Sequence, residues 1–180
     1  ERALPQLMEC LDLAKRYAMD PLRAVALATL AKVLLCMGGK RYGKARAFLK
    51  AAMPLIMQHG HIWFQGEAYL TLAKCTMAEI STTGKVYYNV ELHKMAVAEL
   101  KKAESYFEQI EDVQRLRQVY YLLARMYNSI PNAKKERDNA AKKFAQLSIA
   151  KNEREGNSVM ETSSNGDQWS VLQGVLITDS

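Results

Sequence analysis

The triplet Leu30-Ala31-Lys32 returns as Leu72-Ala73-Lys74 and, with arginine, as Leu123-Ala124-Arg125. Around each triplet the same order recurs: a helical pattern that holds the triplet, a turn, and a second helical pattern that opens on alanine. These second segments read "ARAFLKAA", "AVAELKKA" and "AAKKFAQL". A unit that recurs along a chain buries its apolar face by stacking on its neighbours. The repeat therefore predicts an all-α solenoid built of helix pairs.

Apolar residues recur with the period of an α-helix through residues 1–151, and no alternating strand pattern competes with it. Seven antiparallel helices are expected, over residues 3–17, 22–37, 43–57, 62–80, 90–110, 113–129 and from Asn132 to about 151. The second of these has few polar residues, so we expect it to be buried between neighbours. The segment "STTGKVYYN" (81–89) interrupts the pattern with turn-forming residues.

Capping residues, glycine and proline refine the expected ends of these helices. Asp20-Pro21 predicts an N-cap followed by proline in the first turn, and Asn132 can cap the last helix. Gly38-Gly39 predicts a helix end in the left-handed conformation. Pro54 lacks the N–H that would donate to residue 50, so a kink or a restart is expected there.

A small residue beside an aromatic or aliphatic one, in both helices of each pair, is typical of tetratricopeptide-type repeats. The pattern departs from that family because the triplets are 42 and 51 residues apart, no tryptophan opens a repeat and no proline closes one. Three pairs preceded by one unpaired helix fit best. The residues expected to pack between repeats are Leu30, Ala31, Leu72, Ala73, Leu123, Ala124 and Tyr127.

The charge is distributed unevenly along the chain. Residues 1–60 hold ten lysines and arginines against four acids, a net charge of +6, and the remainder sums to zero. A cluster without any acid suggests either a solvated basic face or a surface for an acidic patch on a partner protein: Lys40, Arg41, Lys44, Arg46 and Lys50. Nucleic acid is the less favoured ligand, because only Tyr42 offers an aromatic ring beside these cations.

The last 29 residues, from Asn152, carry a net charge of −4 and end in the apolar run "WSVLQGVLI". We divide the chain into a repeat domain, 1–151, and a segment, 152–180, that is either disordered or a docking tail. Trp169 is the candidate partner-binding residue of this tail. The aromatic pairs Tyr120-Tyr121 and Trp63-Phe64 place at most one ring inward, so the second ring can fill the core or anchor a partner.

Several functional classes are disfavoured. No apolar run approaches the roughly 20 residues of a membrane span. His59-Gly60-His61 supplies at most two metal ligands, whereas structural zinc takes four. The three cysteines, Cys10, Cys36 and Cys75, form no CxxC pair and are expected to be buried, reduced thiols. No nucleophile has a base beside it. We therefore expect no catalytic residue, no metal and no cofactor.

Five segments carry a resemblance to a known family: "ALPQLMECLDLAKRYAMDPLRAVALATLAKVLL", "LAKCTMAEIS", "AELKKAESYFEQIED", "VYYLLARMYNSI" and "ERDNAAKKFAQL". In this order, over about residues 3–151, they resemble the carboxy-terminal tetratricopeptide-like repeats of the subunit 5 family of the anaphase-promoting complex (cyclosome). The resemblance implies a piece of a longer, intracellular scaffold subunit of a multi-subunit E3 ubiquitin ligase, acting in mitosis and cell division. It implies a location in nucleus and cytoplasm, other subunits of the complex as partners, and no binding to nucleic acid or membrane.

The alternative function is a free-standing tetratricopeptide adaptor that binds short peptide tails. Such adaptors use lysines and asparagines on the first helices of successive repeats. This chain offers chiefly Lys32, Lys74 and Arg125 there, with few asparagines. An enzyme would instead need a polar cluster inside a pocket.

Overall fold

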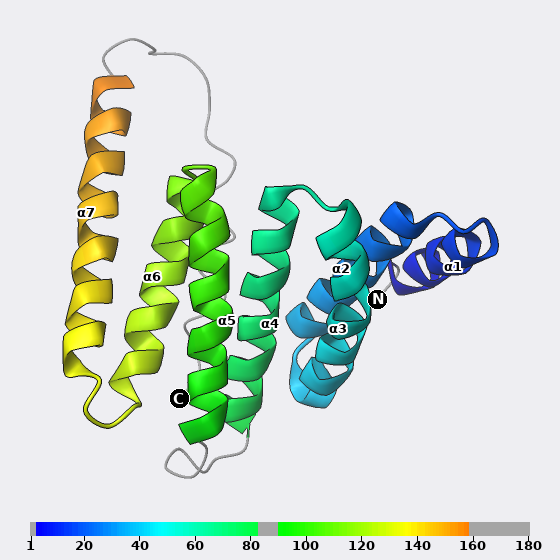
Figure 1. Ribbon diagram of the computed structural model, residues 1–180, viewed down its shortest axis with the longest axis horizontal. Coiled ribbons are helices and arrows are strands. Elements are labelled where there is room, and N and C mark those ends of the chain that lie inside the picture. The colour runs from blue at the N-terminus through cyan, green and yellow to red at the C-terminus, as the bar shows by residue number, and fades with distance from the viewer. Residues whose placement is uncertain (1–2, 83–89, 159–180) are drawn as a thin grey trace.

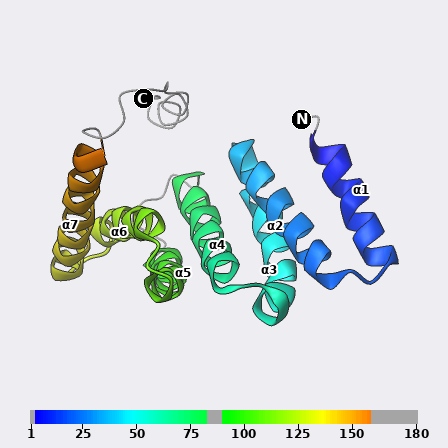
Figure 2. The same ribbon diagram turned by 90° about the horizontal axis from the view of Figure 1, so that it is seen from above.

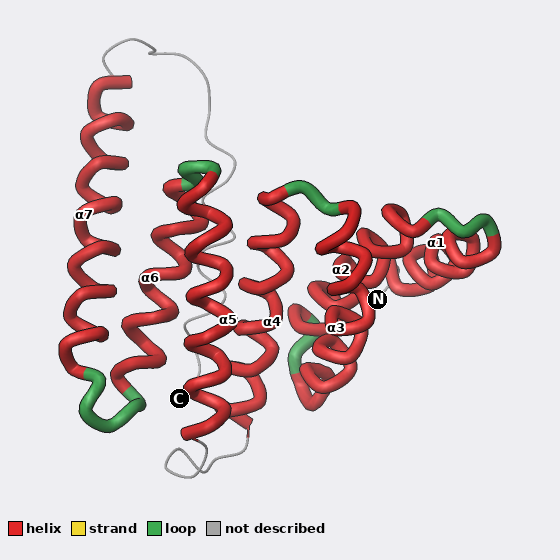
Figure 3. Tube along the Cα trace, viewed as in Figure 1, coloured by secondary structure: helices red, strands yellow, loops and turns green. Residues whose placement is uncertain are grey.

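The computed structural model describes residues 3–82 and 90–158, which are helical almost throughout (Figure 3). The α-helices in these ranges are α1 (Ala3–Arg16), α2 (Asp20–Cys36), α3 (Tyr42–His59), α4 (Ile62–Thr82), α5 (Val90–Gln109), α6 (Val113–Asn128) and α7 (Lys134–Ser158). A short 3-10 helix (Gly39–Arg41) precedes α3. The prediction of seven helices and of an all-α fold is confirmed.

The helices pack in chain order as an extended array. The most extensive contacts join α2 with α3, α4 with α5, and α6 with α7, so these are the three helix pairs (Figure 1). Contacts of α1 with α2, α3 with α4 and α5 with α6 link the pairs, and the view from above shows the helices following one another from α1 to α7 (Figure 2). Each recurring triplet lies in the first helix of a pair, and the packing is that of a helical solenoid.

Two apolar clusters form the core, and α4 contributes to both. Ala68, Leu72 and Cys75 belong to the cluster shared with α1, α2 and α3, whereas Leu70 and Ala73 belong to the cluster shared with α5, α6 and α7. A helix between two clusters buries opposite faces, and the buried residues of α4 include the polar side chains of Glu67, Thr71 and Thr76. α4 therefore connects the two halves of the core.

The burial expected for α2 is found only in part. Six of its residues are buried, but Val25 remains 48% exposed and Cys36 lies on the surface. The reason is that α2 belongs to the first pair, so only α1 packs on its outer side.

Two predicted caps are wrong. Met19 precedes α2, and Asp20 is the first helical residue, where its carboxylate lies 3.9 Å from the Arg23 guanidinium. Asn132 adopts a left-handed conformation (φ 63°) in the turn, and α7 begins with the backbone N–H of Arg137 donating to the Ala133 carbonyl. Asp20 thus belongs to the first turn of α2, and Asn132 belongs to the turn that precedes α7.

The structure also decides the predictions made for Gly38, for Pro54 and for the end of the last helix. Gly38 follows α2 with a positive φ of 64°, which glycine tolerates, but its ψ of −157° differs from the left-handed helical conformation that was expected. Pro54 does not end α3, which runs through to His59. Its missing N–H leaves the Lys50 carbonyl without an intrahelical donor, and both residues lie on the exposed side of the helix, where water can replace it. The last helix extends to Ser158, beyond the predicted end at about residue 151.

Candidate functional site on the first helices of the pairs

A buried carboxylate joins the first helices of all three pairs. Glu67 of α4 is only 4% exposed. One oxygen, Oε1, accepts a hydrogen bond of 2.8 Å from Lys32 Nζ of α2, and the other, Oε2, lies 3.3 Å from Arg115 Nε of α6. Because a buried carboxylate is costly unless it is paired, these two cations fix the positions of α2 and α6 relative to α4.

The same two cations also lie over an aromatic ring. Lys32 Nζ is 5.9 Å and Arg115 Cζ 5.7 Å from the centroid of the Trp63 indole, one turn before Glu67 on α4. Both distances are within the range of cation–π attraction. Trp63 and Glu67 therefore hold one cation from each side of α4.

A third cation, Lys74, approaches from the next turns of α4. Burial lowers the pKa of Lys74, Arg115 and Lys32 lower it further, and Glu67 opposes the shift. The negative charge of Glu67 thus attracts three cations. We name Lys32, Trp63, Glu67, Lys74 and Arg115 the Glu67 cluster, which leaves the first-helix face of the array locally cationic.

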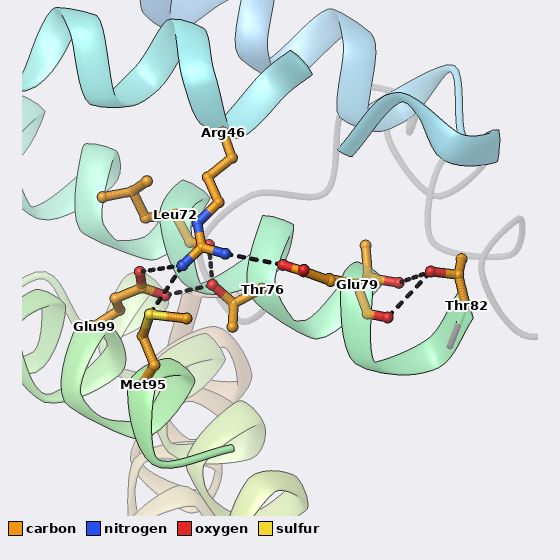
Figure 4. A network of polar contacts seen from close by, with 8 residues as sticks. Arg46, Leu72, Thr76, Glu79, Thr82, Met95 and Glu99 are labelled. Carbon is orange, nitrogen blue, oxygen red and sulfur yellow. Dashed lines mark hydrogen bonds and ion pairs between the residues drawn. The ribbon is translucent and has the colours of Figure 1, made fainter. Parts of the chain in front are cut away.

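A second polar network joins α3 to the pair that follows it. Figure 4 shows Arg46 reaching from α3 to Glu79 of α4 and to Met95 and Glu99 of α5. The guanidinium lies 2.9 Å from the Glu79 carboxylate and 4.0 Å from that of Glu99, while Thr76 donates a 2.8 Å hydrogen bond to Glu99. Burial raises the pKa of Glu99 although Thr76 and Arg46 oppose it.

A third network holds the last helix in place. Glu104 of α5, 5% exposed, accepts hydrogen bonds from Lys101 (2.7 Å) and from Lys143 of α7 (3.1 Å). Burial alone would raise its pKa, but the two lysines hold the pKa of Glu104 below its ordinary value. Lys143 also donates to the Tyr120 hydroxyl at 3.3 Å, and burial raises the pKa of Tyr120 to about 12.

Most of the residues predicted to pack between repeats are buried. Leu30, Ala31, Leu72, Ala73 and Leu123 are at most 5% exposed. Ala124 and Tyr127, in the last pair, are half-buried and pack against the second core cluster. Their role in the repeat contacts stays a prediction that substitution would test.

The predicted basic face divides into two parts. Lys40, Arg41, Lys44 and Lys50 are exposed. Arg46 differs, because its side chain is 14% exposed and is paired with Glu79. The Arg46 guanidinium is held inside the network of Figure 4, and the partner-binding role of all five cations stays a prediction. Trp169 lies outside the described residues.

The three cysteines have different surroundings, so the expectation of three buried thiols is wrong. Cys75 is buried, and burial raises its pKa to about 11. Cys10 is half-buried and Cys36 exposed. His93 is buried on α5. Tyr121 is 49% exposed and its neighbour Tyr120 is buried, which agrees with the expectation that at most one ring of this pair points inward.

A pocket of about 750 Å3 opens beside the Glu67 cluster. Its lining comes from the start of α4, from α6 and its cap, and from α7: Trp63, Asp112, Gln114, Arg115, Arg117, Gln118, Tyr121 and Phe144. Arg117 and Gln118 were not singled out by the sequence, because neither sits in a motif. Within the described ranges, no group of three or more histidine, cysteine or acidic side chains is placed to hold a metal ion. Among the same residues, no helix is long and apolar enough to cross a membrane.

The sequence of this chain has relatives among known proteins. No family model matches the chain. Curated relatives named anaphase-promoting complex subunit 5 match over 145 residues, 81% of this chain, at 30% identity in Mus musculus and Homo sapiens and 26% in Gallus gallus. The chain spans about a fifth (19%) of the length of these relatives. The resemblance inferred from the sequence is thus confirmed: over most of its length this chain is similar to a region of anaphase-promoting complex subunit 5.

Proposed function

We propose that this chain acts as a non-catalytic scaffold within the anaphase-promoting complex, holding neighbouring subunits through the surfaces of its helix pairs. The observation that carries the proposal is its similarity, over 145 residues, to relatives named as subunit 5 of that complex. The partners are other subunits of the complex, and the cellular setting is cell-cycle control in nucleus and cytoplasm. The helix pairs act as tetratricopeptide-type repeats in this proposal.

The first two helices offer a surface suited to this role. Six of the large apolar side chains that are well exposed lie on these two helices or in the turn between them: Met8, Leu13, Tyr17, Met19, Leu22 and Val25. Tyr17 alone is 72% exposed. Several large apolar side chains exposed on one part of a structure indicate a place where another protein surface can pack. We assign this surface, the α1–α2 patch, to contact with a neighbouring subunit or a further part of a longer chain.

The lining of the pocket beside the Glu67 cluster supports a binding role over catalysis. Asp112 is its one carboxylate, and its Oδ1 accepts a hydrogen bond of 3.0 Å from the Arg115 backbone N–H at the start of α6. An acid that caps a helix is a poor general base, since its lone pairs are already directed at the backbone. The arginine and glutamine side chains that surround it are ligands for a partner's polar groups.

The experiment is affinity purification of the tagged chain from cells, followed by mass spectrometry. Recovery of other anaphase-promoting complex subunits supports the scaffold, and recovery of chaperones alone supports the peptide-adaptor alternative. The variant Leu13→Ser/Tyr17→Ser tests the α1–α2 patch, because it removes two exposed side chains and should lower recovery without lowering the thermal midpoint. Lys15→Ser/Arg16→Ser, two exposed cations of the same helix, is the matched control.

A further inference from the structure

One arginine of the pocket beside the Glu67 cluster has no anionic partner. Within the part of the chain that the structure describes, Arg117 makes no ion pair or side-chain hydrogen bond, and its Nε is buried without an acceptor. The guanidinium lies 5.9 Å from the centroid of the Phe144 ring of α7. A half-buried guanidinium stacked on an aromatic ring is held in place and still requires acceptors.

The surroundings of Arg117 favour an anion. Lys32, Lys74, Arg115 and Arg117 carry positive charge around the pocket and the adjoining cluster, against the carboxylates of Glu67 and Asp112, a local excess of two. Both carboxylates are already engaged, Glu67 by two cations and Asp112 by the backbone of α6. An entering carboxylate would find a donor at Arg117 without displacing an existing pair.

The walls of the pocket add apolar contact. The ring centroids of Tyr121, which is 49% exposed, and Phe144 are 6.0 Å apart, and Trp63 also lines the pocket. Exposed aromatic rings beside arginine are the side chains that dominate protein interfaces. A volume of about 750 Å3 accommodates a few residues of an extended chain and is too small for a folded domain.

We infer that this pocket binds a short acidic segment of a partner protein, with an aspartate or glutamate on Arg117 and an apolar side chain between Tyr121 and Trp63. The inference rests on the proposed scaffold function, because it names the kind of segment that a neighbouring subunit contributes. A nucleic acid fits less well, since it presents a phosphate at every step, whereas the pocket holds the carboxylate of Asp112 and the adjoining cluster that of Glu67.

Selection of random nine-residue peptides displayed on phage, against the immobilised 180-residue chain, tests the inference and does not require the partner to be identified. Expected peptides carry at least one acid next to an aromatic or large aliphatic residue. Their affinity should fall about tenfold for Arg117→Gln, which is about 1.4 kcal/mol. Tyr121→Ala should weaken them by a similar factor. Lys142→Gln, which removes one exposed charge of α7 outside the lining, is the matched control and should leave the affinity unchanged.

Three results would overturn the inference: selected peptides without acids, equal affinity for wild type and Arg117→Gln, or a stronger interaction with a labelled single-stranded oligonucleotide than with any selected peptide. A synthetic peptide of residues 159–180, with net charge −3, is included as a further probe. Binding of this peptide alone is a fourth such result, because the occupant would then be residues 159–180 of this chain and not a partner. Circular dichroism of each variant establishes that the fold is kept. If co-purification recovers the complex and the selection fails, only the pocket assignment fails.

Discussion

The Lys32 ammonium of α2 and the Glu67 carboxylate of α4 are 2.8 Å apart, across 35 residues of sequence and between two successive helix pairs. Arg115 of α6 reaches the same carboxylate from the third pair. A single acidic side chain therefore contacts a cation from each neighbouring pair. Because these contacts are directional, they fix how the first helices of the pairs stand beside one another, which apolar packing alone leaves less defined.

Replacing Glu67 by glutamine should destabilise the fold. The substitution keeps the size of the side chain but leaves Lys32, Lys74 and Arg115 close together without their shared anion. Removing one member of a buried ion pair costs about 3–5 kcal/mol, and the partial exposure of these cations reduces the expected loss to about 1–3 kcal/mol. Urea unfolding followed by circular dichroism measures it. Glu91→Gln, whose side chain is 82% exposed, is the control and should have little effect. Equal stability of the two variants would show that the Glu67 cluster contributes nothing to the fold.

Gly66 of α4 should not tolerate a methyl group. A Cβ built there would lie 3.0 Å from the Phe107 ring and 3.1 Å from the Tyr106 Cβ, where α5 approaches α4 closely. Overpacking costs about 1–3 kcal/mol, and the better helix propensity of alanine returns up to about 1 kcal/mol of this. We expect Gly66→Ala to lower the thermal midpoint. Gly43→Ala, at a helical position with no atom within 4 Å, should raise it slightly. Equal midpoints would contradict the close approach.

Glu104 should stabilise the protein in a pH-dependent manner. Lys101 and Lys143 hold its pKa below the ordinary 4.5, so the folded protein binds the proton less tightly than the unfolded chain. This contribution is complete above pH 4.5 and is lost as the pH falls through the lowered pKa. We expect Glu104→Gln to cost about 1 kcal/mol at pH 7 and progressively less in acid. Urea unfolding between pH 3 and 7 tests this, and a difference that does not change with pH would exclude the ionised pair.

Glu99 should show the opposite dependence. Burial raises its pKa above the ordinary 4.5, so its stabilising contribution is present below pH 4.5 and is lost as the pH rises through the raised pKa. Glutamine keeps an oxygen for the Thr76 hydroxyl, and Arg46 keeps its 2.9 Å pair with Glu79. The stability of Glu99→Gln relative to wild type should therefore increase from pH 4 to pH 7. A relative stability that decreases over this range would mean that the Arg46 charge outweighs burial.

The candidate site shows where sequence reasoning was limited. The three triplets are visible in the sequence, and Lys32 and Lys74 stand out as cations beside the repeat alanines. Glu67 was missed, because one glutamate in an apolar helix has no motif around it. Glu67 follows Trp63 by four residues and precedes Lys74 by seven, so all three lie on one stripe of α4. This spacing is the sequence signal that could have indicated Glu67. Arg46 looked like one cation of an exposed cluster and proved to be an internal residue.

Periodicity by itself determined the class of fold, the number of helices and their pairing, because burial of an apolar stripe requires a neighbour whatever that neighbour's identity. It placed Ala31 and Ala73 inside and predicted that a helix ends at Gly38, where the backbone has a positive φ. Which side chains meet across the pairs was decided only by the tertiary structure. Polar side chains separated by 23 to 49 residues, such as Thr76 with Glu99 and Arg46 with Met95, are brought together by the rotation and offset of packed helices. Helical spacing along one segment does not encode those two quantities, which depend on how side chains of different helices interdigitate.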